Sequence, residues 1–269
     1  MAFLGIIASP PTTQPSLGWL VGGFALLIAG LASLTMGLRR GAPAPRAGPR
    51  RALSYALVYG LCSACFWRVL ESALLGQERS PWLLALGDVI FITIALFVWV
   101  MVLAEGHPLG DYGFRRVPAG RLLLTLLMGV GAAAAYSLPA WRDIWAFRVH
   151  WNADNVVFGM LFAALGSAIP EEVVFRGYLM TSLNGRAGQW ARVALPALAF
   201  TAVRAVRFLP GSTLGVAGWL GYIFGVALPL GLWWGLMREL AGGAIWPGLI
   251  SHFLLELGPL LAGSSPALP

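Results

Sequence analysis

Long uninterrupted apolar runs make up most of the chain, and short polar stretches separate them. Each run approaches or exceeds the roughly 20 apolar residues that cross a lipid bilayer as a helix. The runs are continuous, whereas the strands of a membrane-spanning β-barrel alternate apolar and polar residues. The pattern therefore predicts an all-α polytopic membrane protein with about eight transmembrane helices. The predicted spans are residues 18–38, 52–76, 81–105, 120–140, 155–183, 190–208, 214–238 and 244–262.

Polar stretches rich in proline, glycine and arginine mark the connections between the runs. The most pronounced is RRGAPAPRAGPRR at residues 39–51, which we expect to be an irregular basic loop. A second stretch covers residues 106–121. We divide the chain there, into an N-terminal transmembrane region at residues 1–110 and a core at residues 111–269. Because His107 begins this second loop, we expect its side chain to be exposed.

The composition supports a membrane protein, and in such a protein a positive net charge need not indicate nucleic-acid binding. Hydrophobic residues make up 58% of the chain and charged residues 11%, against about a quarter charged in a soluble domain. The formal net charge is +7, and all the basic residues are arginine. Arginines beside membrane spans set the topology, and no polar domain combines basic with aromatic residues. We therefore expect membrane lipid, and no nucleic acid, among the partners.

The arginines also orient the chain in the membrane. If the N-terminus is non-cytoplasmic, most loop arginines fall on the cytoplasmic side, as the positive-inside rule requires. The exclusive use of arginine favours a GC-rich bacterial genome, so we expect the inner (cytoplasmic) membrane, with both termini non-cytoplasmic. The cytoplasmic loops then hold Arg39, Arg40, Arg46, Arg50, Arg51, Arg115, Arg116, Arg121, Arg186, Arg192 and Arg238, and the outer loops hold Arg79, Arg142 and Arg148.

Three charged residues interrupt the apolar segment GSAIPEEVVFRGYL. Glu172 and Arg176 are four residues apart on one helical face, with the acid first, which is the favourable order for an ion pair. Glu171 lies about 100° round the helix and lacks that partner. Pro170 removes the hydrogen bond to the carbonyl of Gly166 and can bend the helix there. A carboxylate inside a membrane span is a candidate functional group.

Two later spans carry polar residues at a similar depth. Phe200 and Arg204 share one face of the first, and His252 and Glu256 share one face of the second. Counted from the predicted cytoplasmic ends at 1.5 Å per residue, Glu171, Arg204 and His252 lie roughly 12–20 Å deep. We expect these three side chains to face one interior cavity.

These segments resemble a known family. EEVVFR, HFLLE and the run GLMRELAGGAIWPGLISH are similar to segments of the CAAX protease and bacteriocin-processing family, a family of glutamic intramembrane proteases. That family carries EExxxR, FxxxH and HxxxN/D motifs on separate membrane helices. The resemblance covers roughly residues 110–262 and implies that the core is an intramembrane protease core. The chain departs from the pattern at Arg204, which replaces the histidine of FxxxH, and at Glu256, which replaces Asn or Asp.

The resemblance implies roles for the charged residues. Glu171 would be the general base that activates a water molecule for peptide hydrolysis. His252 would orient that water or donate to the oxyanion, and Glu256 could hold its imidazole. Glu172 and Arg176 would brace the base, with Phe200 as a further supporting residue. The implied substrate is a membrane-anchored peptide or protein tail, and no cofactor is implied.

Arg204 leaves two interpretations open. An arginine is always protonated and cannot act as a base. It can pair directly with Glu171, which would give a silenced membrane binding or scaffold protein. It can also lie further away and stabilise the oxyanion, as a catalytic residue beside Glu171 and His252. The retained motifs favour the second interpretation.

Two further alternatives are disfavoured. Glu171, His252 and Glu256 are acceptable metal ligands. However, the guanidinium of Arg204 would repel a divalent cation, and an HExxH motif is absent. A transporter could use intramembrane acids as a proton relay, but no duplicated pattern of broken helices supports this function.

Overall fold

The computed structural model describes residues 48–75, 94, 96–145, 156, 159–207 and 216–261. The predicted span at residues 18–38 lies outside the described residues, as does most of the basic loop. The side chains of the outer-loop arginines Arg79, Arg142 and Arg148 lie outside them too.

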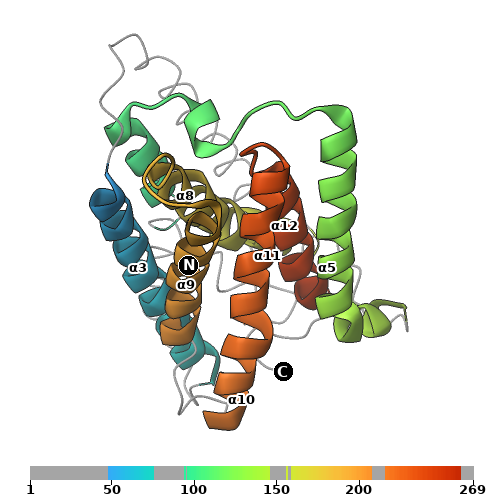
Figure 1. Ribbon diagram of the computed structural model, residues 1–269. Helices are drawn as coiled ribbons and strands as arrows, with labels where there is room; N and C mark the ends of the chain where they lie inside the picture. Colours follow the sequence, from blue (N-terminus) through green and yellow to red (C-terminus); the bar gives the residue numbers. More distant parts are fainter. Residues whose placement is uncertain are drawn as a thin grey trace.

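Every regular element in this part of the chain is helical, which confirms the all-α class there (Figure 1). Most elements are α-helices, η2 is a 3₁₀-helix, and η3, η4 and η5 are π-helices. In chain order the elements are α3 (Pro49–Leu75), η2 (Leu109–Tyr112), α5 (Ala119–Trp145), η3 (Phe162–Ala168), α7 (Ile169–Glu171), η4 (Glu172–Leu179), α8 (Met180–Ser182), α9 (Gln189–Arg207), α10 (Val216–Tyr222), η5 (Ile223–Ala227), α11 (Leu228–Leu240) and α12 (Trp246–Leu261).

The helices coincide with predicted spans where the structure describes them, except η2, which lies in the predicted loop at residues 106–121. For example, α9 occupies Gln189–Arg207 where the sequence predicts 190–208. Within the described residues, one continuous helix, Val216–Leu240, is long and apolar enough to cross a membrane. The number of eight transmembrane helices stays a prediction.

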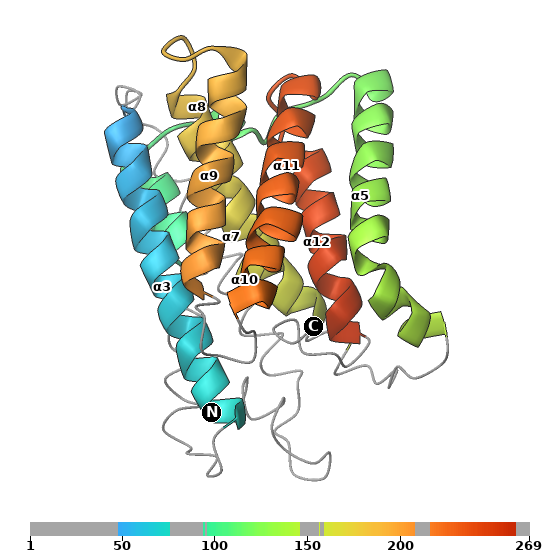
Figure 2. The same ribbon diagram turned by 60° about the horizontal axis from the view of Figure 1, so that its bottom comes forward.

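The helices form one bundle, in which α3, α9, α11, α12 and α5 lie side by side (Figure 2). The helix that runs from η3 to α8 packs against α3, α9 and α12. The aromatic rings of Tyr59 on α3 and Phe175 on η4 are 6.0 Å apart. Helices from both sides of residue 110 therefore share a core, and the domain division at that residue stays a prediction.

Glycines allow α11 to approach α9 closely. A Cβ atom at Gly231 would lie 3.3 Å from the backbone of Ala197, and one at Gly235 would lie 3.1 Å from a methyl group of Val193. Small residues four apart are a common device for close packing of membrane helices. This contact fixes α9, and therefore Arg204, against the centre of the bundle.

Two π-helical segments flank Pro170. The residues before it form η3 and those after α7 form η4, in which all eight residues are buried. Proline has no backbone N–H to donate, and π-helical turns are frequent at functional sites. Because a π turn changes the angle between successive side chains, a helical wheel drawn from the sequence does not give the directions of the polar groups here.

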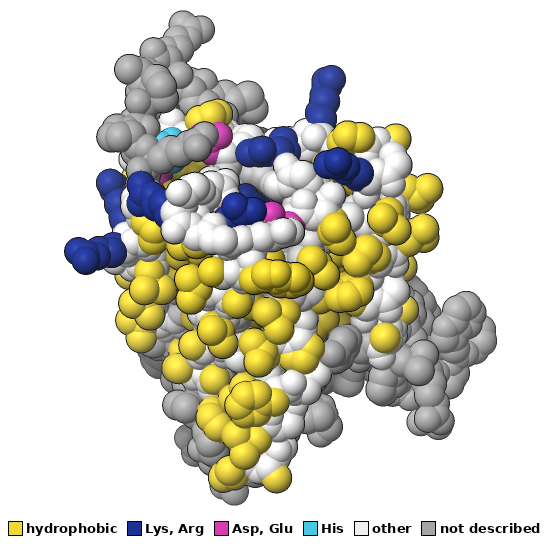
Figure 3. All heavy atoms as spheres, in the orientation of Figure 1, with side chains coloured by type: hydrophobic (Ala, Val, Ile, Leu, Met, Phe, Trp, Pro, Cys, Tyr) yellow, Lys and Arg dark blue, Asp and Glu magenta, His cyan; other side chains and the backbone are white. Residues whose placement is uncertain are grey.

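The surface is divided between arginines and apolar side chains. Figure 3 shows the basic groups gathered at one end of the bundle, above sides covered by hydrophobic groups. A wide apolar belt of this kind is typical of a surface that contacts another apolar phase. Which side of a membrane the arginine-rich end faces stays a prediction. Exposed apolar residues include Leu57 and Leu61 of α3, Leu123 and Leu127 of α5, and Leu195 and Leu198 of α9.

The exposure predicted for His107 is wrong. Its side chain is buried at 5% exposure, because the connection from residue 106 to 118 folds back over the ends of the helices. The ring of His107 lies 6.4 Å from that of Tyr112, and Tyr112 stacks on Tyr178 at 5.7 Å. The backbone of the same connection accepts a hydrogen bond at Gly113 from the N–H of Ile245 (3.1 Å).

Candidate active site

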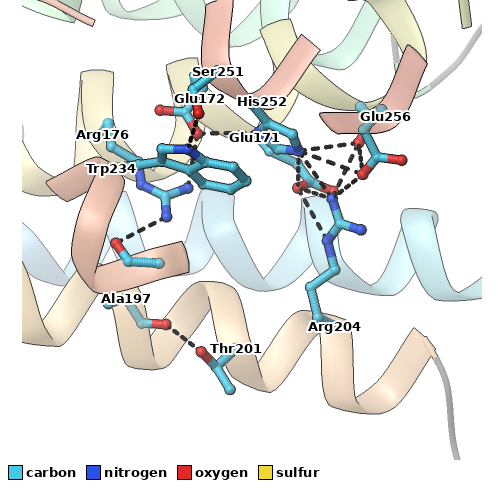
Figure 4. Close-up of polar contacts among 12 residues, drawn as sticks. Glu171, Glu172, Arg176, Ala197, Thr201, Arg204, Trp234, Ser251, His252 and Glu256 are labelled. Carbon is cyan, nitrogen blue, oxygen red and sulfur yellow. Dashed lines mark hydrogen bonds and ion pairs between the residues drawn. The ribbon is translucent and has the colours of Figure 1, made fainter. Parts of the chain in front are cut away.

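Three helices bring Glu171, Arg204 and His252 together inside the bundle (Figure 4). Arg204 Nη2 lies 2.6 Å from Glu171 Oε2 and 3.1 Å from His252 Nε2. His252 Nε2 lies 3.5 Å from Glu171 Oε2. All three side chains are buried. The three side chains therefore lie close together, as expected from the sequence. Their catalytic roles stay predictions.

Arg204 is the centre of this cluster. Its Nε and Nη2 both donate to Glu171 Oε2, and Nη2 also lies 2.8 Å from Glu256 Oε1. The sequence favoured a guanidinium held away from Glu171, and the structure corrects this with direct contact. The physical reason is that a buried guanidinium needs counter-charge, and two carboxylates lie within reach.

His252 contacts two glutamates, Glu172 through Nδ1 and Glu256 through Nε2. Its Nδ1 lies 3.2 Å from Glu172 Oε1. A carboxylate only accepts, so we place the imidazole proton on Nδ1, which leaves Nε2 as an acceptor toward Arg204. Glu256 Oε1, which was expected to hold the imidazole, lies 3.6 Å from Nε2 and also accepts from Arg204. The indole of Trp234 stacks on the imidazole of His252, with the two ring centres 4.2 Å apart.

The predicted pair of Glu172 and Arg176 is confirmed. Arg176 Nη1 donates to Glu172 Oε1 at 3.1 Å, and both side chains are at most 1% exposed. Arg176 Nη2 also donates to the carbonyl of Gly231 (3.2 Å). Phe200 touches both guanidinium groups, with its ring centre 4.5 Å from Cζ of Arg176 and 5.3 Å from that of Arg204. The aromatic ring therefore stabilises both cations by cation–π contact.

The sequence analysis missed three residues of the site. Ser167 Oγ lies 3.1 Å from Arg204 Nη2, and its position four residues before Glu171 was a usable signal. Trp234 donates from Nε1 to Ser251 Oγ (3.0 Å), and Ser251 donates to the carbonyl of Gly129 (2.7 Å). Nothing in the local sequence indicates that this tryptophan stacks on a histidine of another helix.

The charges of the cluster bear on metal binding. Arg204 Nη2 lies within 3.1 Å of oxygens of Glu171 and Glu256 and of the imidazole of His252. A fixed positive charge thus fills the position that a divalent cation would take among these three ligands. Among the residues that the structure describes, no group of three or more His, Cys, Asp or Glu side chains is arranged to hold a metal ion.

Part of the chain matches a known protein family. Residues 153–258 match the family described as Rce1-like, type II CAAX prenyl endopeptidase Rce1-like. This range contains every side chain of the site described above, and it confirms the family resemblance of the motifs. No curated protein and no solved structure matches the chain.

Proposed function

We propose that this chain is an intramembrane endopeptidase, because residues 153–258 match the family of type II CAAX prenyl endopeptidases described as Rce1-like. Its substrate is a membrane-anchored peptide or protein tail, and its other partner is membrane lipid. The observation that carries the proposal is the convergence of Glu171, Arg204 and His252 within 3.5 Å, inside the matched residues. The apolar sides of the bundle support an integral membrane protein (Figure 3).

Glu171 is the general base of the proposed reaction. It takes a proton from a water molecule as the water oxygen attacks the scissile carbonyl carbon. In the free protein, Glu171 Oε2 accepts two hydrogen bonds from Arg204. Arg204 must therefore turn away before Oε2 can take a proton.

Arg204 supplies the electrostatic stabilisation. The substrate carbonyl oxygen gains negative charge in the transition state and competes with Glu171 for the guanidinium. Transfer of Arg204 from the carboxylate to the oxyanion would release the base and stabilise the transition state in one movement. Glu171 passes the proton that it took from water to His252 Nε2, which lies 3.5 Å from Glu171 Oε2. His252, whose ring Glu172 orients through Nδ1, delivers this proton to the amine as the C–N bond breaks.

The remaining parts of the proposal concern metal and location. We propose chemistry without a metal or cofactor, which the guanidinium among the carboxylates supports. We also propose a bacterial inner membrane, with the arginine-rich end cytoplasmic and both termini non-cytoplasmic, on the positive-inside rule.

The test is cleavage of a membrane-tethered reporter peptide by the purified protein in liposomes. Glu171→Gln should lower the rate per folded molecule by about 10²–10⁴-fold, the usual contribution of a general base. Because it also removes one of the two carboxylates that neutralise buried Arg204, the thermal unfolding midpoint in detergent should fall as well. Glu239→Gln is the matched control, because Glu239 pairs with Arg192 outside the cluster and should retain full activity. Undiminished cleavage by Glu171→Gln would exclude this residue as the base.

A specific observation favours a second candidate, a silenced family member that binds or scaffolds. The two residues that depart from the family motifs, Arg204 and Glu256, form an ion pair with each other at 2.8 Å. Arg204 also holds Glu171 at 2.6 Å. These contacts use the groups that hydrolysis needs.

The double variant Arg204→His/Glu256→Asn separates the two candidates, because it restores the FxxxH and HxxxN pattern. If the parent cleaves no tail and the double variant does, the parent is a silenced protease. If the parent cleaves and the double variant is no better, the ion pair belongs to a working site.

A further inference from the structure

Arg238 is a buried arginine to which neither the fold nor the proposed reaction gives a counter-charge. It lies near the end of α11 and is 3% exposed. Among the residues that the structure describes, its guanidinium has one hydrogen-bond partner, Thr181 Oγ1 at 2.6 Å from Nη2, and its Nε has none. Arg176 and Arg204, by contrast, each contact at least one carboxylate. A buried guanidinium without a counter-charge is costly, so Arg238 indicates an anion that comes from outside the bundle.

The carboxylates that attract Arg238 are engaged elsewhere. The two oxygens of Glu239 accept from Arg192 Nε at 3.2 Å and from Arg192 Nη2 at 2.8 Å. Glu172 also attracts Arg238, but Glu172 Oε1 accepts from Arg176 Nη1 at 3.1 Å. Neither glutamate forms an ion pair with Arg238. The positive charge of Arg238 is therefore not neutralised by direct contact within the described part of the chain.

Two exposed arginines lie beside the turn that follows Arg238. The turn joins α11 to α12 through Gly242 and Gly243, which both have positive φ, and the N–H of Gly243 donates to the carbonyl of Arg238 at 2.8 Å. A Cβ atom at Gly243 would lie 3.5 Å from Arg115 Nη1, and one at Gly242 would lie 3.7 Å from Arg121 Nη1. Arg115 is also close enough to Arg238 for their charges to repel each other. Three arginines thus gather at one glycine turn, at the arginine-rich end of the bundle (Figure 3).

Exposed tryptophans indicate that this end of the bundle lies at the level of lipid headgroups. Trp190, in the first turn of α9, is 76% exposed, and Trp246, the first residue of α12, is 39% exposed. Figure 2 shows the first turn of α9 and the turn between α11 and α12 at the same end. Tryptophan is enriched where the apolar core of a membrane meets the headgroups. The anion within reach of the three arginines is then the phosphate of a phospholipid.

We propose that Arg115, Arg121 and Arg238 bind the headgroup of an anionic phospholipid at the turn between α11 and α12. Arg115 and Arg121 are exposed and contact the phosphate directly. Arg238, inside the bundle, attracts the phosphate through an interior of low dielectric constant and gains its counter-charge. Basic pockets between membrane helices are typical sites for anionic headgroups. The site lies outside the cluster of Glu171, and it binds lipid without a peptide substrate.

The experiment measures lipid binding by the purified full-length protein in a neutral detergent. Phosphatidylglycerol, phosphatidylcholine or inorganic phosphate is added alone. Thermal unfolding gives the midpoint, and native mass spectrometry gives the number of bound lipids. We expect phosphatidylglycerol to raise the midpoint by about 5 °C at about 100 times its Kd. Phosphatidylcholine and inorganic phosphate should raise it much less.

The double variant Arg115→Gln/Arg121→Gln tests the exposed part of the site. Both side chains are exposed, so the variant should fold. Its Kd for phosphatidylglycerol should rise by about 30-fold, the scale of two arginines at an anionic lipid surface. The matched control, Arg50→Gln/Arg186→Gln, removes two exposed arginines from the same end beside α3, where Arg186 Nη1 lies 3.2 Å from the Cβ position of Gly48. The control should retain the Kd of the parent.

Arg238→Met tests the buried part of the site. Without anionic lipid, this variant should unfold at or above the midpoint of the parent, because it removes a buried charge that has no counter-charge. It should also gain less stability than the parent from phosphatidylglycerol. A lower midpoint without lipid would mean that the chain already neutralises Arg238, and would overturn its part in the site.

Three further results would overturn the inference. An equal loss of affinity in the control double variant would mean that the arginines act only through net charge. Equal stabilisation by phosphatidylcholine or by inorganic phosphate would exclude an anionic lipid headgroup as the occupant. Unchanged affinity in Arg115→Gln/Arg121→Gln would exclude the turn as the site. No peptide is cleaved in these measurements, so each result leaves the proposed peptidase function to its own test.

Discussion

Arg176 and Arg204 are both buried and both contact glutamates, yet the chain holds them in different ways. Arg176 pairs with Glu172 of its own helix, four residues earlier, at 3.1 Å. Arg204 pairs with Glu171 and Glu256, which lie on two other helices, at 2.6 and 2.8 Å. The first pair depends on helical spacing, whereas the second depends on how three helices pack.

The two arginines also differ in the kinds of group that they contact. The guanidinium of Arg176 is fixed by Glu172, by the carbonyl of Gly231 and by the ring of Phe200. Arg204 instead contacts Ser167 and His252. Arg176 therefore has its charge partner within its own helix, whereas the charge partners of Arg204 lie on two other helices.

We expect the largest effect from a substitution of Glu172, which contacts both Arg176 and His252. Glu172→Gln removes the charge that partners Arg176 and orients His252. We expect the free energy of unfolding to fall by about 3–5 kcal/mol, the usual cost of leaving one member of a buried pair alone. Cleavage should fall as well, because the imidazole loses its anchor. Denaturant titration in detergent and the reporter assay measure the two effects.

The double variant Glu172→Gln/Arg176→Gln is the control for this prediction. It removes both charges of the pair, so it should recover part of the stability but not the cleavage. Unchanged stability of Glu172→Gln would contradict the bracing role of the pair.

Replacement of each arginine by leucine tests the comparison directly. Arg204→Leu should lower cleavage by about 10²-fold or more, the scale of a lost oxyanion donor, and Arg204→His should retain part of the activity. Arg176→Leu should act chiefly on stability, because Arg176 touches none of the proton-carrying groups except through Glu172. Reporter cleavage per folded molecule is the measurement. Equal losses in the two leucine variants would mean that the two arginines do not differ in role.

Gly177→Ala tests the packing beside Arg176. A Cβ atom there would lie 2.6 Å from the carbonyl oxygen of Tyr112, so the backbone must shift. We expect a loss of about 1–3 kcal/mol in the free energy of unfolding, typical of overpacking. Gly225→Ala is the control, since a Cβ atom at Gly225 meets nothing within 4 Å. An unchanged free energy of unfolding in Gly177→Ala would show that the backbone at Tyr112 can shift away from η4 at little cost.

The smallest effect is expected at a third arginine, on the same helix as Arg204. Arg192 pairs with Glu239 at 2.8 Å, but their side chains are 23% and 15% exposed. Solvent weakens such a pair, so Arg192→Ala should cost no more than about 1 kcal/mol and should leave cleavage unchanged. Thermal unfolding at low and high salt gives the value. If Arg192→Ala lowers the free energy of unfolding as much as Glu172→Gln does, burial does not explain why the two ion pairs differ in strength.

The sequence alone determined the parts of this protein that depend on local periodicity. Continuous apolar runs predicted helices such as α9 and the continuous helix Val216–Leu240 near their observed bounds, because every backbone group of a helix bonds within its own segment. The four-residue spacing of Glu172 and Arg176 predicted their ion pair, because side chains four residues apart lie on one face of a helix. The motifs around Glu171 and His252 also indicated the family.

Only the tertiary structure decided which groups meet across helices. Glu172, on another helix, holds the imidazole of His252 beside the expected Glu256, and Ser167 contacts both Arg204 and Glu256. The π-helical turns beside Pro170 redirect side chains by an amount that a regular helical wheel does not contain. Contacts between helices also depend on the close approach at Gly231, which is set by packing in three dimensions. The partners of Arg204 therefore followed from the assembled bundle, because its charge had to be neutralised by whichever carboxylates the packing brought within reach.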